Sequence, residues 1–170
     1  MPDEPALKQL HRSGTMFLLA RPGEYRNHEV QVGDHDGNVR HQPPPWQLVP
    51  GLMQTFFRQL SSLWASGDAL DISAYCLWKI NWVHPFRNGN GRTARAFAYS
   101  CLSLKLGGVL PGTITIIDLI MSNRKAYEDA LKVADDSFAV APHHPDLRPM
   151  KAFLDSLLQQ QIASIPAVTE

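Results

Sequence analysis

Apolar residues recur at helical spacing along most of the chain, which predicts a mainly α-helical fold. The segment from about Asp71 to Val83 is apolar nearly all round, a pattern typical of a buried central helix. Further helices are predicted at about residues 6–20, 50–66, 90–106, 115–122, 124–135 and 146–162. The apolar members of the first of these are Leu7, Leu10, Phe17 and Leu18.

One early segment has a different pattern, which predicts the chain's only β-structure. Apolar and polar residues alternate from Glu29 to Val32, residues 33–38 are typical of a turn, and Val39 to Gln42 is extended again. A run of three prolines then ends the second strand. We therefore expect one domain over residues 1–170, mainly α, with a β-hairpin at about residues 28–42.

The charge balance narrows the classes of partner. Lys+Arg and Asp+Glu both number 16, and a net charge of zero argues against a nucleic-acid-binding or anionic-membrane-binding protein. Cys76 and Cys101 lie in apolar helical segments and are expected to be reduced core thiols, which favours a cytoplasmic location. The acidic start and the lack of a long apolar run predict neither a signal peptide nor a membrane span.

Residues 84–95, with the sequence HPFRNGNGRTAR, carry the chemistry. Gly89 and Gly91 permit positive φ and leave room for a ligand against the backbone. A helix is expected to start directly after this turn, and its first N–H groups have no partner within the helix. Because the helix dipole adds positive character there, the turn and the helix start form a predicted anion site.

Three side chains complete this predicted site. Arg92 and Arg95 are three residues apart and therefore neighbours on the helix, where their guanidinium groups suit phosphate oxygens. His84 lies at the rim, where it can accept a hydroxyl proton. The chain lacks the Gly-x-x-x-x-Gly-Lys-Ser/Thr loop, and a helix rather than a strand precedes the glycines, which excludes a dinucleotide fingerprint.

The same residues resemble the signature of the Fic domain family, H-x-F-x-[D/E]-G-N-G-R-x-x-R, and depart from it only at Asn88. The resemblance extends from about Tyr25 to Asp135, with the hairpin in the place of the family's flap. It implies a mostly helical enzyme that moves AMP from ATP to a hydroxyl group of a target protein. Mg²⁺ is the implied cofactor, and pyrophosphate is released.

The resemblance also implies a role for each residue that matches the family's pattern. His84 would deprotonate the Ser, Thr or Tyr of the target, and Tyr127 would flank the adenine. The implied binding residues for the α- and β-phosphates are Gly89, Asn90 and Gly91, and those for the β- and γ-phosphates are Arg92 and Arg95. The implied flap strand, which would align the target by main-chain pairing, is Val30, Gln31, Val32 and Gly33.

Asn88 stands where the family places an acidic metal ligand, so the resemblance makes it the candidate metal ligand of this chain. An amide oxygen brings no negative charge, so we expect weaker metal binding and slower transfer, a higher metal requirement or use of another nucleotide. Two alternatives stay open. One is the same fold transferring UMP, phosphocholine or a phosphate, and the other is a nucleotide-binding or interaction module without catalysis.

The family's inhibitory motif, Ser/Thr-x-x-x-Glu-Gly/Asn, is absent from this sequence. The inhibitory element is then expected on a separate antitoxin-like protein, on a removed segment, or nowhere. Delivery to another cell as an effector or toxin is the alternative to the cytoplasmic location.

Overall fold

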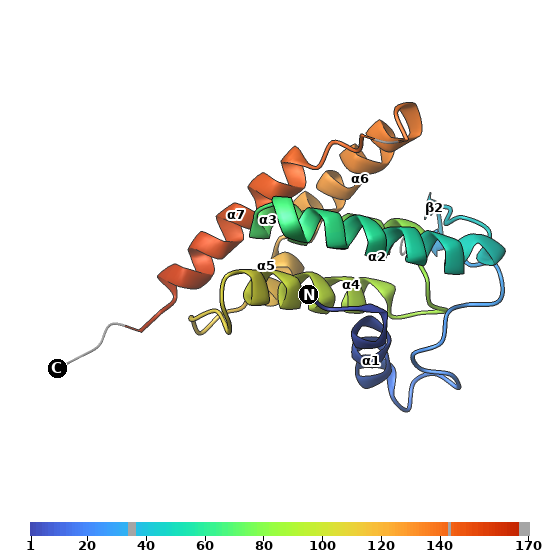
Figure 1. Cartoon of the computed structure of the whole chain (residues 1–170), viewed down its shortest axis with the longest axis horizontal. Coiled ribbons are helices and arrows are strands. Elements are labelled where there is room, and N and C mark those ends of the chain that lie inside the picture. The colour runs from blue at the N-terminus through green and yellow to red at the C-terminus, as the bar shows by residue number, and fades with distance from the viewer. Residues whose placement is uncertain (34–36, 143, 167–170) are drawn as a thin grey trace.

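The computed structural model describes residues 1–33, 37–142 and 144–166. This part of the chain forms seven α-helices and one small antiparallel sheet, which confirms the expected mainly α-helical fold (Figure 1). The helices are α1 (Glu4–Thr15), α2 (Val49–Ser66), α3 (Ala69–Val83), α4 (Asn90–Lys105), α5 (Ile116–Ser122), α6 (Arg124–Val140) and α7 (Arg148–Ala163), with a 3₁₀ turn, η1 (Trp46–Leu48). The strands are β1 (Val32–Gly33) and β2 (Val39–His41).

Helix α3 is the centre of the molecule, as its apolar pattern predicts. It packs against α2, α4, α6 and α7, and Trp78, Ile80 and Val83 are among its fully buried side chains. The side chain of Asp68 caps its N-terminus by accepting a hydrogen bond from the N–H of Asp71 at 2.8 Å. The central helix is thus fixed at its start by a capping carboxylate and along its length by packing.

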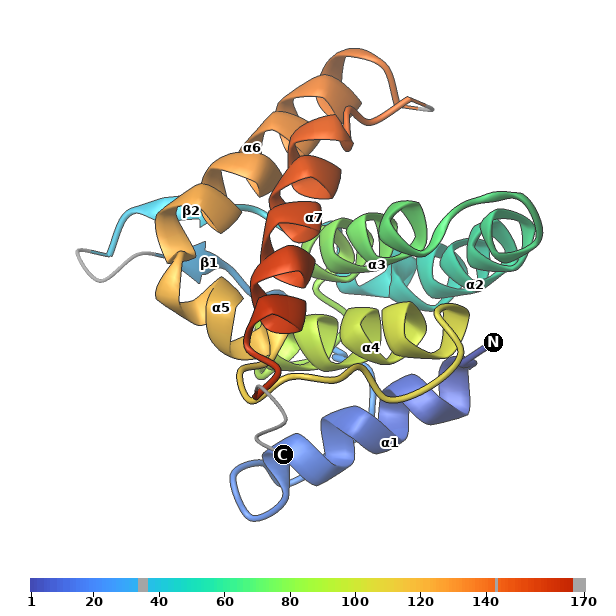
Figure 2. The same ribbon diagram turned by 90° about the vertical axis from the view of Figure 1, so that its left-hand side faces the viewer.

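The connection between α3 and α4 lies at one end of this helix pair. Helix α1 lies alongside α4, and the β-hairpin lies beside the start of α6 (Figure 2). The residues of the α3–α4 connection are therefore enclosed between α1 on one side and the hairpin with α6 on the other. Cys76 and Cys101, on α3 and α4, are buried and free as predicted.

Two predicted elements are shorter than the sequence indicates. Helix α1 ends at Thr15, whose carbonyl accepts hydrogen bonds from the N–H groups of Leu18 and Leu19 and so closes a turn. The prediction that the helix continues to about Ala20 is wrong: Phe17 and Leu18 lie beyond its end, their exposed fractions are 97% and 68%, and Phe17 has a φ of 65°.

The first strand begins only at Val32, so the predicted flap residues Val30 and Gln31 lie just before it. Val32 pairs with His41 and Gly33 with Val39, with an irregularity between the two pairs. Residues 34–36 of the predicted turn lie outside the described residues. Helix α6 runs to Val140, beyond the predicted end near residue 135. In the described part of the chain, none of the helices combines the length and the apolar character that crossing a membrane requires.

The Asp68 cap gives a testable stability effect. We expect Asp68→Ala to lower the free energy of unfolding by about 1 kcal/mol, because the first turn of α3 loses its side-chain acceptor. Asp68→Asn is the matched control, since it keeps the capping oxygen and removes only the charge that faces Lys151 at 2.6 Å. Urea unfolding measures both, and an equal loss in the two variants would mean that the ion pair rather than the cap matters.

Candidate active site

The residue that follows the last residue of α3 is His84, which caps the helix in a left-handed conformation with φ 51° and ψ 58°. A left-handed residue is a common end for a helix, and Pro85 prevents the helix from continuing. The N–H of His84 still donates to the carbonyl of Ile80 at 3.0 Å. The backbone therefore turns sharply at the very residue that the sequence identifies as the base.

The ring of His84 is held in one tautomer. Its Nδ1 lies 3.2 Å from the carbonyl oxygen of Asn81, which can only accept, so Nδ1 carries the proton and Nε2 keeps a free lone pair. Burial lowers the pKa of His84 to about 4, against the raising effect of this hydrogen bond and with smaller lowering effects from His41 and Arg26. The histidine is neutral at pH 7 and can act as a proton acceptor.

The loop that follows is closed by the side chain of Asn90. The Oδ1 of Asn90 accepts from the N–H of Phe86, and its Nδ2 donates to the carbonyl of Phe86, both at 2.8 Å. Asn90 is 1% exposed and Phe86 is fully buried. Since both ends of the amide form hydrogen bonds inside the loop, the side chain of Asn90 fixes the shape of the turn.

His11 of α1 supports the same loop and was not found from the sequence. Its ring stacks on Phe86 with centroids 3.8 Å apart, and its Nδ1 accepts from the N–H of Gly23 at 2.8 Å. Its Nε2 therefore carries the proton and donates to the carbonyl of Asn88 at 2.9 Å. Burial lowers the pKa of His11. The only sequence signal is a histidine four residues after Leu7, on the apolar face of α1.

Gly89 requires a glycine for two reasons. Its φ is 76°, and a Cβ at this position would lie 2.7 Å from the methyl group of Thr15. The N–H of Thr93 donates to the carbonyl of Gly89 at 3.0 Å and is the first such bond of α4. The N–H groups at positions 90–92 therefore lie outside the hydrogen bonds of the helix, as the predicted anion site requires.

Asn88 forms part of the turn. Its Oδ1 accepts from the N–H of Gly89 at 2.7 Å. This is one neutral oxygen, and in the described residues no group of three or more His, Cys, Asp or Glu side chains could hold a metal ion. The described residues therefore do not fit a metal site of their own, because a hard cation needs several oxygen ligands.

The two signature arginines have different surroundings. Arg92 is exposed and donates from Nη1 to the carbonyl of Gly14 in α1. Arg95 is partly buried, and its Nε has no hydrogen-bond acceptor among the described residues. Burial lowers the pKa of Arg95, since the charged form is partly desolvated. A desolvated guanidinium with an unused N–H donor is suited to a phosphate oxygen.

A cavity of about 940 Å³ lies between the hairpin, the end of α3, the start of α4 and helices α5 and α6, and some of the residues above line it. A cavity of this size suits a nucleotide. The predicted site residues on its wall are Val32, Gly33, His84, Gly91, Arg95 and Tyr127. The other predicted residues do not line it: Val30, Gln31, Asn88, Gly89, Asn90 and Arg92.

Helix α6 provides the wall opposite His84. Tyr127 is 6% exposed, and its hydroxyl accepts from Nδ2 of Asn81 at 2.9 Å, while burial raises its pKa to about 12. Asp135 accepts from the indole N–H of Trp78 at 2.9 Å and lies 3.8 Å from Nδ1 of His41. Burial raises the pKa of Asp135. Its carboxylate thus links α6 to both the central helix and the hairpin.

A helical domain that presents a neutral histidine and a phosphate-binding turn at one cavity matches a known family of proteins. A sequence profile described as Fic/DOC family matches residues 2–102. This chain belongs to the Fic/DOC family.

The curated relatives agree with this assignment. The protein named Protein adenylyltransferase Fic from Drosophila persimilis is 32% identical over 133 residues, which are 78% of this chain and 22% of that protein. The protein of the same name from Drosophila melanogaster is also 32% identical over 133 residues, which are 23% of its length. This chain therefore spans less than a quarter of the length of these relatives.

Two solved structures have the same fold. The crystal structure of a Fic family protein from Desulfovibrio desulfuricans G20 matches with a TM-score of 0.71 and 26% identity, over 98% of this chain and 49% of that chain. A Fic domain containing signaling protein from Bacteroides thetaiotaomicron VPI-5482 matches with a TM-score of 0.72 and 21% identity, over 96% and 60% of the two chains. The second match supports the fold alone.

The lowered pKa of His84 predicts a dependence of stability on pH. Between about pH 4 and pH 6.5 the unfolded chain binds more protons at this residue than the folded chain, so its contribution to stability is lost as the pH falls through this window. The slope from one such group is at most about 1.4 kcal/mol per pH unit.

We expect His84→Gln to flatten the fall in unfolding free energy between pH 6.5 and pH 4.5. His28→Gln replaces an exposed histidine and should leave the fall unchanged. Urea unfolding at several pH values measures the difference. Parallel curves for the wild type and His84→Gln would show that the ring is not neutralised by burial.

Proposed function

We propose that this chain transfers AMP from ATP to a hydroxyl group of a target protein, with His84 as the general base. The observation that carries the proposal is the free Nε2 of a neutral, half-buried His84 at the same cavity as the unpartnered Nε of Arg95. The relatives named protein adenylyltransferase support the class of reaction. An acceptor for a hydroxyl proton and a binding group for phosphate are the two elements that this reaction requires.

In this reaction, the hydroxyl oxygen of the target forms a bond to the α-phosphorus of ATP. Its proton passes to Nε2 of His84, and the bond from the α-phosphorus to the bridging oxygen breaks, so that pyrophosphate leaves. The backbone N–H groups at positions 90–92 and the guanidinium of Arg95 are suited to bind the phosphate oxygens and the negative charge that develops on them. Tyr127 provides one buried wall of the same cavity, where the base of the nucleotide is expected.

Target alignment is assigned to the hairpin. Within the described residues, β1 pairs only with β2, so the other edge of β1 offers unpaired backbone groups to an extended segment of a target. Val32 and Gly33 belong to this strand, and Val30 and Gln31 extend the same edge towards the N-terminus. Main-chain pairing would place a target side chain over the cavity without selecting strongly for its sequence.

The metal ion has a minor place in the proposal. Mg²⁺ is expected to arrive with ATP and to be held mainly by the phosphate oxygens, since Asn88 offers one neutral oxygen that already accepts from Gly89. No step assigned to the chain's own residues depends on the ion.

Labelled ATP tests the reaction and the transferred group together. We expect ATP labelled at the α-phosphate to label proteins of a cell lysate, and His84→Ala to reduce the rate by about 10²-fold or more, the usual contribution of a general base. His28→Ala is the matched control at an exposed histidine. Labelling from the γ-phosphate, UTP or a phosphocholine donor instead would identify another transferred group, and equal labelling by the wild type and His84→Ala would refute the proposed base.

Asn88 gives a separate test of the metal. We expect Asn88→Asp to lower the Mg²⁺ concentration for half-maximal labelling severalfold, because the added charge favours a divalent cation. Asn27→Asp, at an exposed position outside the loop, controls for the change in net charge. A rise in the metal requirement would contradict the expectation. ATP binding without turnover in both the wild type and Asn88→Asp would favour a nucleotide-binding module, which the neutral oxygen of Asn88 also fits.

A further inference from the structure

The C-terminal end of α3 presents carbonyl oxygens that have no partner within the helix. The carbonyl of Asn81 takes Nδ1 of His84, and the carbonyl of Trp82 accepts from Nε2 of His41 at 2.8 Å. The next carbonyls, at positions 83, 84 and 85, all point towards a single residue, Arg26, that lies in the segment before the flap.

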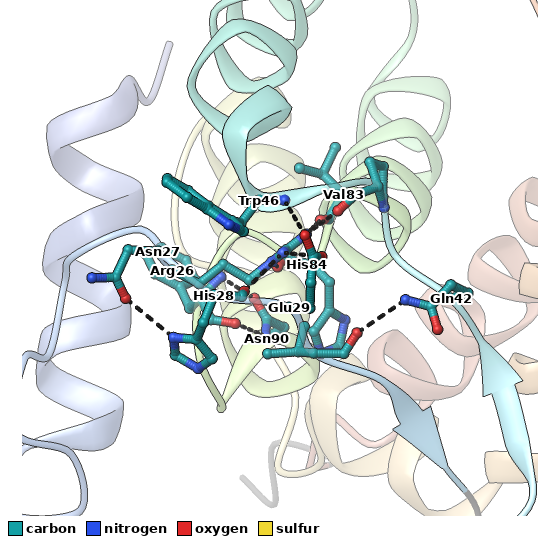
Figure 3. Close-up of polar contacts among 12 residues, drawn as sticks. Arg26, Asn27, His28, Glu29, Gln42, Trp46, Val83, His84 and Asn90 are labelled. Atoms are coloured by element: carbon teal, nitrogen blue, oxygen red, sulfur yellow. Dashed lines mark hydrogen bonds and ion pairs between the residues drawn. The ribbon is translucent and has the colours of Figure 1, made fainter.

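Arg26 donates to each of these three carbonyl groups, and Figure 3 labels it together with two of the accepting residues, Val83 and His84. Its Nε donates to the carbonyl of His84 at 2.8 Å, its Nη2 lies 3.4 Å from the carbonyl of Val83, and its backbone N–H donates to Pro85 at 2.8 Å. The side chain is fully buried. A buried cation at the C-terminal end of a helix also offsets the negative end of the helix dipole.

The same guanidinium binds both ends of the flap. Its Nη1 donates to the carbonyl of His28 at 3.2 Å, just before the hairpin, and its Nη2 donates to the carbonyl of Pro44 at 2.5 Å, just after it. Glu29 lies 3.7 Å away and is the counter-charge. The flat fork of an arginine has donors in the fixed directions that these carbonyls need, and the ammonium of a lysine does not.

We propose that Arg26 is a positioning residue that locks the catalytic histidine to the base of the flap, so that proton acceptor and target-docking strand keep one fixed relative position. The inference rests on the proposed function only in naming His84 as the base and the hairpin as the docking strand. Arg26 does not line the cavity that binds the substrates, so it acts through His84 and not on the nucleotide. A small displacement of a catalytic group is enough to slow transfer.

The first test uses the wild-type protein and needs no activity. We expect the Nε–H of Arg26 to give a slowly exchanging signal in ¹⁵N nuclear magnetic resonance at pH 7, with close contacts to protons of His84. Rapid exchange of this proton with water would overturn the proposal, because a donor locked between helix end and flap is shielded. This measurement decides the question even if every substitution of Arg26 fails to fold.

The second test compares Arg26→Lys with Arg21→Lys, which changes an arginine whose side chain is 75% exposed. We expect Arg26→Lys to change the ATP dissociation constant less than twofold and to lower the labelling rate at saturating ATP about tenfold or more. Arg21→Lys should change neither quantity. An unchanged labelling rate in Arg26→Lys, or a loss of ATP binding in proportion to the rate, would overturn the proposal.

A third readout separates positioning from general stability. The charged or titratable groups around His84 are Arg26 before the flap, His41 on β2 with Asp135 of α6 behind it, and Arg95 on α4. Loosening the ring from its site should move the pKa of His84 in Arg26→Lys upward from about 4 towards its ordinary value. An unmoved pKa would overturn the proposal. If the wild type transfers nothing, the proposed function fails. The exchange rate of the Arg26 Nε–H and the pKa of His84, both followed by nuclear magnetic resonance, still decide the role of Arg26.

Discussion

The chain must reverse direction between its two closely packed helices α3 and α4 within residues 84–89, and most of the carbonyl groups in that short turn accept a hydrogen bond from another part of the chain. A buried polar group without a partner costs free energy, so the carbonyl groups at the end of α3 need hydrogen-bond donors. Arg26 and His41 donate to them from the hairpin side, while His11 of α1 and Asn90 at the start of α4 hold the turn. The hairpin, α1 and the ring of His84 are all held in place by hydrogen bonds that meet this single requirement.

The same requirement sets the electrostatics of the cavity. The Nδ1 of His84 donates to a helix carbonyl, which leaves Nε2 unprotonated and able to accept a proton. Burial lowers the pKa of His84 and also desolvates Arg95, whose Nε has no acceptor among the described residues. Because a buried donor without a partner costs free energy, an anion in the cavity would be favoured there. The hydrogen bond that satisfies the helix end therefore also sets the protonation of His84. The cavity combines a neutral proton acceptor with a desolvated cation.

The sequence predicted the elements whose pattern is local. The central helix, the buried cysteines and the left-handed turn with Gly89 follow from periodicity and glycine placement, and the family was evident from the motif. The roles of His11 and Arg26 could not be predicted, because they depend on contacts with residues 77 and 58 positions away. The end of the first helix was predicted too late, because apolar residues continue to Leu18, whereas hydrogen bonds to the carbonyl of Thr15 close a turn there.

The amide of Asn90 forms its hydrogen bonds within its own loop, which shows that residues of the signature differ in what they contribute to the site. Gly89 and Asn90 define the shape of the turn, whereas His84 and Arg95 offer polar atoms without a partner to the cavity. Substitution of the first pair is therefore expected to change the backbone of the loop, and substitution of the second pair to change the chemistry of the cavity while the loop keeps its shape.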